Sequence, residues 1–397
     1  MNSTRDNQDL ARDLARFSSF KELRASPTYL RYEERLRSLF NEPVIYASPA
    51  VRPRLRSFLR VVQWNIERGS RLEGIIEVLN THPVLRYADL LLLNELDEGM
   101  VRSENRNVAK ELADALEAHL VYGVEYLELT KGVGAEARLP GENTSALHGN
   151  AILTRHDFFN PRIIRLPRCE SNFESAERRL GGRNAILLEL EFSSGRMTAA
   201  TSHLDVVNTP ACRGRQISAL LQAIDRRTPH DNSAPIIIGG DFNTHTFARG
   251  TRLRTIKNVA VIFGSDPHKL ASRLLDPHPR EPALKELARH GYDLASFNDD
   301  RATSSSIVSS LDDVNRLPFP VRGWAMRRVG PEGLLLRFRL DWLAARGLRP
   351  LSAGEMRDEL TGVESISPTT FSGLSHKGAP LSDHKPIAAD VSLPVIE

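Results

Sequence analysis

Acids and amides at the ends of apolar stretches are the side chains of this chain best placed to do chemistry. The apolar residues 236–238 read as a buried strand, which is followed by two glycines and then by Asp241 and Asn243. Residues two apart on extended backbone point to the same side, so this strand presents a carboxylate and a carboxamide together. Near the C-terminus, Asp383 and His384 stand next to each other. The combination favours metal-assisted hydrolysis of a phosphoester.

Two upstream stretches repeat the pattern of an apolar strand that ends in a polar side chain. The first ends in Asn65 and the second ends in Glu95. In an α/β sandwich such strand ends meet along one sheet edge, and oxygen ligands there suit a hard cation such as Mg²⁺ or Mn²⁺. Zinc would favour clusters of histidine and cysteine, and the two cysteines form no such cluster.

Further polar side chains mark the middle of the chain. His148 and Asn150 lie where a loop enters a strand, and His203 ends the strand expected over residues 198–202. Asp341 follows an alternating segment and precedes a tryptophan. These residues extend the same pattern of polar groups at strand ends.

In this order, the motifs resemble those of the endonuclease/exonuclease/phosphatase superfamily, which includes DNase I, apurinic endonucleases, neutral sphingomyelinases and inositol polyphosphate 5-phosphatases. The resemblance extends from about Phe58 to Val391. Within the superfamily, the chain most resembles uncharacterised bacterial members. Its motifs are Gln-Trp-Asn, Asn-Glu, Gly-Asn-Ala-Ile-Leu, Ser-His-Leu, Gly-Asp-Phe-Asn, Leu-Asp-Trp and Ser-Asp-His. The resemblance implies a DNase I-like fold, a four-layer α/β sandwich of two packed mixed β-sheets flanked by helices, with the site at one sheet edge.

The resemblance also implies which residues hold a metal ion and activate water. Glu95 is expected to be the principal metal-binding carboxylate, with Asn65 beside it and Asp383 contributing. Asp241 is expected to position or deprotonate the attacking water. Asn243 is expected to bind the scissile phosphate or to orient its neighbours. The implied cofactor is Mg²⁺ or Mn²⁺.

A second group of residues is implied to contact the phosphate. Asp341 is expected to hold the imidazole of His384 in one tautomer, and His384 to contact a phosphate oxygen or transfer a proton. His203 is expected to donate to the phosphate or to the leaving oxygen. His148 and Asn150 are expected to line the phosphate pocket. Fixed donors and a cation stabilise the charge that builds up on phosphate oxygens in the transition state.

Several of these residues also have ordinary structural interpretations. Asp241 could cap a turn, His203 could be a hydrogen-bonded core histidine, and His148 could lie in a solvated loop. Arg183 begins a strand near the site edge, whereas Arg213, Arg215 and Gln216 are expected on the solvated face of a helix.

Composition fits a soluble protein. The 397 residues carry 53 Lys and Arg against 50 Asp and Glu, so the net charge is only +3, and nucleic acid stays an open partner that this charge does not specifically indicate. The first thirty residues lack the apolar segment of a signal peptide, and no run is long enough to span a membrane. Two cysteines far apart in the sequence give no disulfide framework, so we expect a reducing compartment and a cytoplasmic location. A single bridge between them is an alternative that the sequence leaves open.

The chain divides into an N-terminal helical extension, 1–54, and a catalytic domain, 55–397. Two helices are expected in the extension, and they could pack on the sandwich or mediate association. Residues 280–291 are expected to contain a helix, because proline lies in its first turn and glycine follows its end. Residues 299–333 are expected to loop over the site and to select the substrate.

Three classes of function stay open for this sequence. A metal-dependent phosphodiesterase or phosphatase is preferred, with nucleic acid, a small phosphoester or a lipid phosphoester as substrate. A nuclease would need a basic groove, and a lipid enzyme an exposed apolar rim or hairpin, and no long apolar hairpin is obvious. The alternatives are a catalytically inactive phosphate-binding module and a scaffold that recruits protein partners through residues 1–54.

Overall fold

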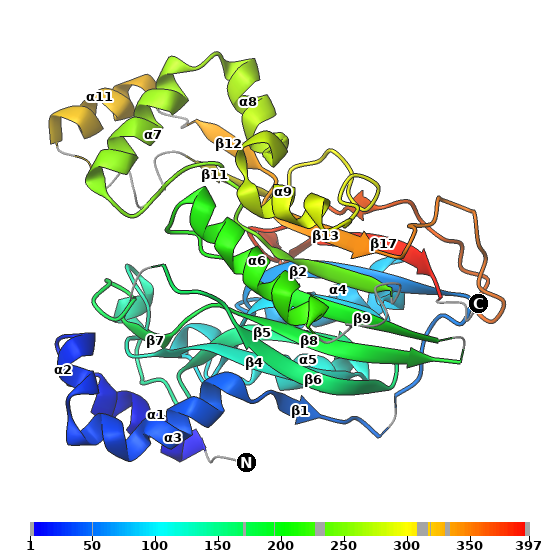
Figure 1. Cartoon of the computed structure of the whole chain (residues 1–397), viewed down its shortest axis with the longest axis horizontal. Coiled ribbons are helices and arrows are strands. Elements are labelled where there is room, and N and C mark those ends of the chain that lie inside the picture. The colour runs from blue at the N-terminus through cyan, green and yellow to red at the C-terminus, as the bar shows by residue number, and fades with distance from the viewer. Residues whose placement is uncertain are drawn as a thin grey trace.

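Two β-sheets pack face to face in the middle of the molecule, and helices cover their outer faces (Figure 1). The computed structural model describes residues 4–49, 51–169, 172–193, 195–226, 235–307, 317, 319–329 and 334–393. The apolar side chains of these residues form three buried clusters. The first lies between helices and the larger sheet, the second between the two sheets, and the third between the smaller sheet and its helices. The four-layer sandwich expected from the sequence is therefore confirmed.

The larger sheet has the order β1-β4-β5-β3-β2-β17-β14, with β7 paired to β4. Its central strands β2 and β3 are parallel, and their ends carry Asn65 and Glu95 to the same edge. The strands are β1 (Val44–Tyr46), β2 (Phe58–Arg68), β3 (Leu90–Glu98), β4 (His119–Glu128), β5 (Leu147–Thr154), β7 (Arg179–Gly181), β14 (Thr369–Thr370) and β17 (Ile387–Ser392).

The smaller sheet has the order β13-β10-β9-β8-β6. Strand β10 is parallel to β9 and antiparallel to β13, and this pairing sets Asp241 directly opposite Asp341. The strands are β6 (Phe158–Arg165), β8 (Asn184–Phe192), β9 (Gly195–Ser202), β10 (Ile236–Asp241) and β13 (Asp341–Arg346). Two-stranded pairs are formed by β11 (Ser304–Ile307) with β12 (Leu335–Phe338), and by β15 (Ser375–His376) with β16 (Ala379–Pro380).

Amphipathic helices cover each sheet. Helices α4 (Leu72–Thr81) and α5 (Val108–Leu116) pack apolar faces on the larger sheet, while α6 (Pro210–Asp225) and α9 (Pro282–Arg289) cover the smaller one. The helix expected within residues 280–291 is thus confirmed as α9. Short 3-10 helices span Leu85–Tyr87, Val101–Ser103, Glu136–Arg138 and His278–Arg280.

The solvated interpretation of helix α6 is wrong for two of its residues. The Arg213 guanidinium is fully buried and lies 2.6 Å from a carboxylate oxygen of Glu281, and Gln216 is also buried. Burying both charges as a pair avoids the cost of leaving either one alone in the interior.

The N-terminal residues pack directly on the larger sheet. Helices α1 (Thr4–Leu14) and α3 (Pro27–Asn41) are joined by the short α2 (Phe20–Arg24), and strand β1 then extends the sheet next to β4. Leu10, Leu14 and Leu36 are buried in the same apolar core as α4 and α5. The expectation of two helices missed α2 and β1, and the extension shares its core with the sandwich.

A small lobe stands apart from the two sheets (Figure 1). It consists of α7 (Arg252–Gly264), α8 (Pro267–Leu275), α11 (Phe319–Val329) and the pair β11–β12, and it has an apolar cluster of its own. Part of the expected loop 299–333 therefore forms β11 and α11. Residues 308–316, 318 and 330–333 of that loop lie outside the described residues.

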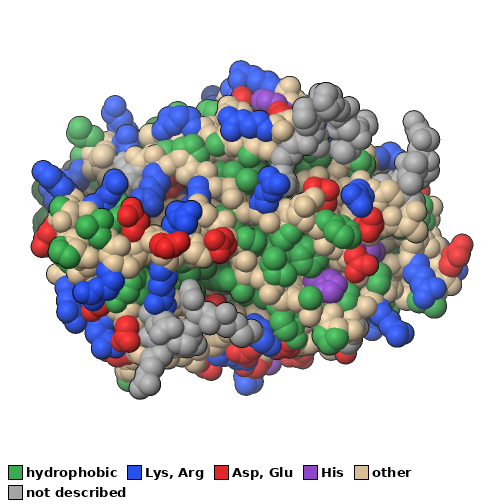
Figure 2. All heavy atoms as spheres, turned by 60° about the horizontal axis from the view of Figure 1, so that its bottom comes forward, with side chains coloured by type: hydrophobic (Ala, Val, Ile, Leu, Met, Phe, Trp, Pro, Cys, Tyr) green, Lys and Arg blue, Asp and Glu red, His purple; other side chains and the backbone are tan. Residues whose placement is uncertain are grey.

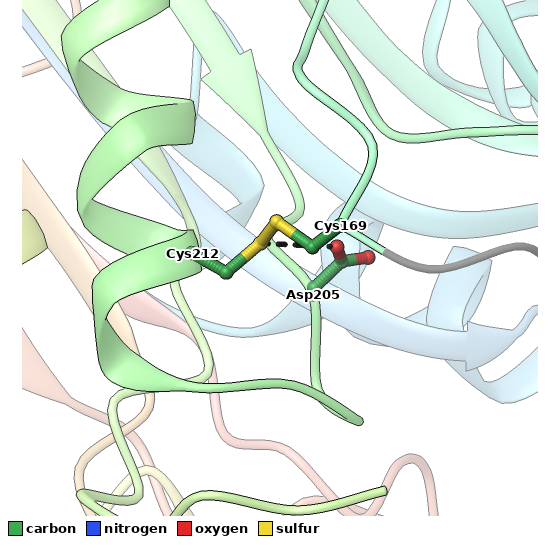
Figure 3. A group of neighbouring side chains, drawn as sticks. All are labelled: Cys169, Asp205 and Cys212. Carbon is green, nitrogen blue, oxygen red and sulfur yellow. Dashed lines mark hydrogen bonds between the residues drawn. A yellow bond between two sulfur atoms is a disulfide. The ribbon is translucent and has the colours of Figure 1, made fainter.

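Cys169 and Cys212 form a disulfide that ties the loop after β6 to the first turn of α6, and Asp205 lies beside it (Figure 3). The sequence left a single bridge as an open alternative, and the structure forms it between residues that are 43 apart in the sequence. Disulfides persist mainly in oxidising compartments, whereas the sequence favours a reducing one, so the cytoplasmic location stays a prediction.

Among the described ranges, no helix is both long and apolar enough to span a bilayer. On the face shown in Figure 2, Lys and Arg side chains are interspersed with Asp and Glu rather than gathered into one basic tract.

Candidate active site

Strand β10 ends in two polar residues that line a cavity. A Cβ at Gly240 would lie 1.8 Å from the carbonyl oxygen of Ser202, so only glycine lets β10 approach β9 so closely. Asp241 follows and is buried, with its Oδ1 accepting the backbone N–H of Asn243 at 2.9 Å. Its own backbone N–H donates to Oδ1 of Asn94 at 2.8 Å. The carboxylate is therefore held in one position.

His384 and Asp341 form a buried pair. Nδ1 of His384 lies 2.7 Å from Oδ2 of Asp341, and the other oxygen of Asp341 accepts a hydrogen bond from Gln63 at 3.1 Å. Burial lowers the pKa of His384, but the charges of Asp341, Asp241 and Asp383 outweigh burial and raise this pKa well above its ordinary value. The imidazole is therefore a cation at neutral pH, and its Nε2 lies 3.8 Å from Oδ2 of Asp241.

The pKa of Asp241 is also raised, but for a carboxyl group this shift favours the neutral form. Burial raises the pKa of the Asp241 carboxyl to about 7, against the opposing effect of the His384 cation and with a further rise from Asp341. A carboxylate with a pKa near neutrality is suited to accept a proton from water.

Asn65 and Glu95 lie side by side where β2 and β3 end. The pairing of these strands shifts register after Asn65, and Glu95 has a left-handed backbone with φ of 57°. Such strained positions in non-glycine residues concentrate at functional sites. The amide of Asn65 donates to Glu95 Oε1 and to Asp241 Oδ2, each at 3.1 Å. The side chain of Asn65 thus connects Glu95 of the larger sheet with Asp241 of the smaller sheet.

Carboxylates gather at this point. Burial raises the pKa of Glu67, and the charges of Asp383 and Glu95 add to the rise while Arg71 opposes it. Glu95 and Asp383 both line the cavity, whereas Glu67 lies 3.1 Å from Arg71. This oxygen donor set fits a hard divalent cation such as Mg²⁺ or Mn²⁺. Asn65 would join it through its oxygen only after its amide flips, since its N–H groups now face the carboxylates.

Two further histidines line the cavity. Nε2 of His203 lies 3.3 Å from Oδ2 of Asp241, and burial, then the charge of Arg183, lowers the pKa of His203 well below its ordinary value. Its Nδ1 has no hydrogen-bond partner within the described structure. Nδ1 of His148 lies 2.7 Å from Asp97. His203 is thus a neutral imidazole whose Nε2 faces Asp241 and whose Nδ1 is buried.

Asn150 is placed differently from the other expected residues. It is fully buried, and it accepts from Asn94 at 2.9 Å and donates to Asn184 at 3.1 Å. This row of amides connects the two sheets behind the cavity, and Asn150 is not among the residues that line it. Asn94 and Gln63, which hold Asp241 and Asp341, were missed, although both lie in the strand-end motifs.

The cavity has a volume of about 460 Å³. Glu95, Asp241, Asn243, Asp383 and His384 share its wall with His148 and His203. The structure therefore brings together all the expected site residues except Asn65, Asp341 and Asn150, of which the first two contact cavity-lining side chains.

Arginines along one side of the cavity were mostly missed by sequence reasoning. The side chains of Arg102 and Arg183 are nearly buried, and each has a nitrogen 2.7 Å from a carboxylate, of Asp97 and of Glu125 respectively. Arg179 pairs with Glu177. Only Arg183, in its Gly-Gly-Arg motif, gave a sequence signal. Arg179 reaches the cavity through the long-range pairing of β7 with β4, and Arg102 lies in the short 3-10 helix after β3.

Residues 62–384 match the sequence profile of the Endonuclease/Exonuclease/phosphatase family. The chain belongs to this family. No curated protein matches this family member significantly in sequence.

Similar solved structures share low identity with this family member. They include an endonuclease/exonuclease/phosphatase from Beutenbergia cavernae DSM 12333, with 16% identity, a TM-score of 0.47, and 85% of this chain and 72% of that chain covered. The human Nocturnin catalytic domain with bound sulfate has 17% identity, a TM-score of 0.46, and coverages of 88% and 97%. A D. rerio TDP2 complex with single-strand DNA product has 16% identity, a TM-score of 0.45, and coverages of 85% and 100%.

Proposed function

We propose that this protein is a divalent-metal-dependent phosphoester hydrolase. The observation that carries the proposal is the placement of Asp241 between a cationic His384 and a neutral His203, in a cavity that also contains Glu95. A base, phosphate donors and a cation site within one cavity are the parts that phosphoester hydrolysis needs. Membership of the family supports the same class of reaction.

Asp241 and Asn243 prepare the attacking water. The Asp241 carboxylate accepts the proton that water loses as its oxygen bonds to phosphorus and the bond to the leaving oxygen breaks. Asn243 is held by a bond from its amide to the carbonyl of Leu204 at 2.9 Å, and it orients the carboxylate through its backbone N–H. The base therefore acts from a fixed position rather than from a flexible loop.

Charge on the phosphate is balanced by donors that are already in place. The N–H of His384 at Nε2 donates to a phosphate oxygen, and Asp341 keeps the ring charged and oriented. The single N–H of the neutral His203, at Nε2 next to Asp241, can donate to a phosphate oxygen in place of the carboxylate, and His148 is oriented by Asp97. A divalent cation held by Glu95, with Asp383 and Asn65, would supply a further positive charge near the leaving oxygen.

A substrate panel tests the proposal. Wild-type protein would be assayed on bis-p-nitrophenyl phosphate, plasmid and single-stranded DNA, RNA, inositol phosphates and sphingomyelin, each with Mg²⁺, Mn²⁺ or EDTA. We expect metal-dependent turnover of at least one substrate, and its loss in Asp241→Ala and His384→Ala. Turnover that persists in EDTA would contradict the metal requirement. Binding of phosphate without any turnover would instead favour the inactive binding module.

A further inference from the structure

The catalytic cavity has an apolar wall that the proposed chemistry does not use. The wall comes mainly from the lobe, and its residues are Phe247, Val259, Ile262, Leu336, Phe338 and Leu340. Most of these side chains also belong to the apolar cluster of the lobe. A substrate that consisted of phosphate and sugar alone would leave this wall in contact with water, so the wall indicates an apolar portion in the substrate.

Helix α7 separates a buried face from an exposed face. Thr255, Val259 and Ile262 are buried toward the cavity. The opposite face is exposed and includes Leu253, which is 73% exposed, and Ile256, three residues further along the helix. The lobe core is complete without these two side chains, so packing does not account for them.

The exposed face of α7 also carries positive charge. Arg252 and Lys257 are exposed next to Leu253 and Ile256, and the helix sequence contains no acidic residue. Long basic side chains that flank protruding aliphatic ones match a bilayer interface, where the aliphatic groups enter the acyl region and the cations stay with anionic headgroups.

Helix α11 repeats this composition beside α7. The rings of Phe263 and Trp324 pack edge to face with centroids 5.6 Å apart, which joins the two helices. Phe319 is 88% exposed at the start of α11, Arg322 and Arg327 are exposed, and this helix also has no acidic residue. Figure 1 shows α7 and α11 next to each other at the end of the molecule.

We propose that this lobe face, defined as Arg252, Leu253, Ile256, Lys257, Phe319 and Trp324, docks on an anionic lipid bilayer, and that the substrate is a lipid phosphoester. The inference rests on the proposed hydrolase function for the chemistry, but not for the docking. The helix that contacts the bilayer with one face contacts the cavity with the other. A lipid phosphate can therefore reach Asp241 and His384 while its apolar portion lies along the lobe wall.

Single-stranded nucleic acid is a less suitable occupant. Aromatic and basic side chains serve such ligands by stacking and by pairing with phosphate. Phe319 and Trp324 are able to stack on bases, but Leu253 and Ile256, which protrude between the basic side chains, offer neither interaction. The cavity wall on the other side of α7 is mainly aliphatic. The lobe face is thus better matched in chemistry to acyl chains and anionic headgroups than to bases.

Vesicle binding of the full chain tests the docking. The wild type would be sedimented with phosphatidylcholine vesicles with and without phosphatidylserine, and titrated in parallel with single-stranded RNA. We expect binding only to the vesicles that contain phosphatidylserine, and a loss of about tenfold or more in the Leu253→Ser/Ile256→Ser variant. Arg252→Gln/Lys257→Gln should weaken binding and reduce its dependence on salt.

A matched variant controls for the loss of exposed apolar side chains. Leu30 and Leu360 are 66% and 61% exposed outside the lobe, so Leu30→Ser/Leu360→Ser should bind vesicles like the wild type. Equal binding by the wild type and by Leu253→Ser/Ile256→Ser would overturn the proposal, as would absence of vesicle binding or preferential binding of RNA through the same residues.

Catalysis is measured separately, so that a failure of docking and a failure of the hydrolase function are distinguishable. Leu253→Ser/Ile256→Ser should hydrolyse bis-p-nitrophenyl phosphate at the wild-type rate and lose activity only on phosphoesters in vesicles. His384→Ala should bind vesicles normally. Vesicle binding without any hydrolysis would leave the docking intact and reject the hydrolase, whereas hydrolysis of the soluble ester without vesicle binding would do the reverse.

Discussion

Replacing Asp341 by asparagine removes one charge from the site and nearly nothing else. The two side chains have almost the same shape, and the oxygen of the introduced amide can still accept the hydrogen bond from Gln63. The N–H groups of that amide, however, would face Nδ1 of His384, which must then accept a hydrogen bond instead of donating one. The imidazole would keep its remaining proton on Nε2 and lose its positive charge.

The size of the effect follows from the geometry of the pair. The two facing atoms lie 2.7 Å apart in a buried position, so the centres of charge are about 4 Å apart and attract by about 4 kcal/mol at an effective dielectric constant of about 20. A cationic His384 stabilises developing phosphate charge, and its neutral form does so much less. If most of this energy appears in the transition state, kcat/KM falls by about 10²–10³-fold.

The assay is metal-supplemented hydrolysis of bis-p-nitrophenyl phosphate, with thermal unfolding as a check on folding. Asp390→Asn is the matched control, because Asp390 is an equally buried carboxylate that accepts two bonds of 2.7 Å from Arg60 away from the cavity. We expect the control to lower the melting temperature and leave kcat of the folded enzyme unchanged. Asp341→Asn with more than about a tenth of wild-type activity would refute the role of the pair.

Three further predictions concern metal binding and stability. Glu95→Gln should weaken Mn²⁺ binding by about tenfold or more in calorimetry, because it removes the principal carboxylate. Cys169→Ser should lower the free energy of unfolding by up to about 4 kcal/mol in denaturant titrations, since the bridge closes a 43-residue separation. Burial lowers the pKa of His156 to about 4, so the contribution of this residue to stability should fall between pH 6.5 and 4 by at most about 1.4 kcal/mol per pH unit.

Each of these predictions has a control and a contradicting result. Glu34→Gln changes an exposed carboxylate and should leave Mn²⁺ affinity unaltered, and equal losses in both variants would contradict a site at Glu95. Wild type treated with reductant should unfold like Cys169→Ser, and no change on reduction would mean that the bridge is not formed. The contribution of His156 falls because the unfolded chain binds the proton first, so His156→Phe should make the pH dependence shallower than in the wild type, and identical pH profiles would contradict it.

Local sequence patterns were sufficient for the strand ends. The stretches before Asn65, Glu95 and Asp241 are apolar runs that stop at a polar residue, and the structure forms strands there. These strand ends could be predicted because the signal lies within a few consecutive residues. The order of the motifs then supplied the family, and with it the pairing of Asp341 with His384, which local patterns alone did not give.

Features that depend on contacts between distant parts of the chain could not be predicted from the sequence. Arg179 reaches the cavity through the pairing of β7 with β4, and Arg102 pairs with the distant Glu177. Arg213 is buried against Glu281, which directly precedes α9. The disulfide likewise depends on the approach of the loop after β6 to α6. The assignment of Asn150 to the pocket rested on its motif, whereas the register of β5 points its amide into the row between the sheets.

The most direct test of the central claim is the rate of p-nitrophenol release from bis-p-nitrophenyl phosphate by wild type and by Asp241→Asn across a Mn²⁺ titration. The account predicts saturable, metal-dependent release by the wild type, abolished by EDTA. In Asp241→Asn it predicts a loss of about 10³-fold or more, with the variant still folded. Equal rates in the two proteins, or a wild-type rate that is independent of metal, would contradict it.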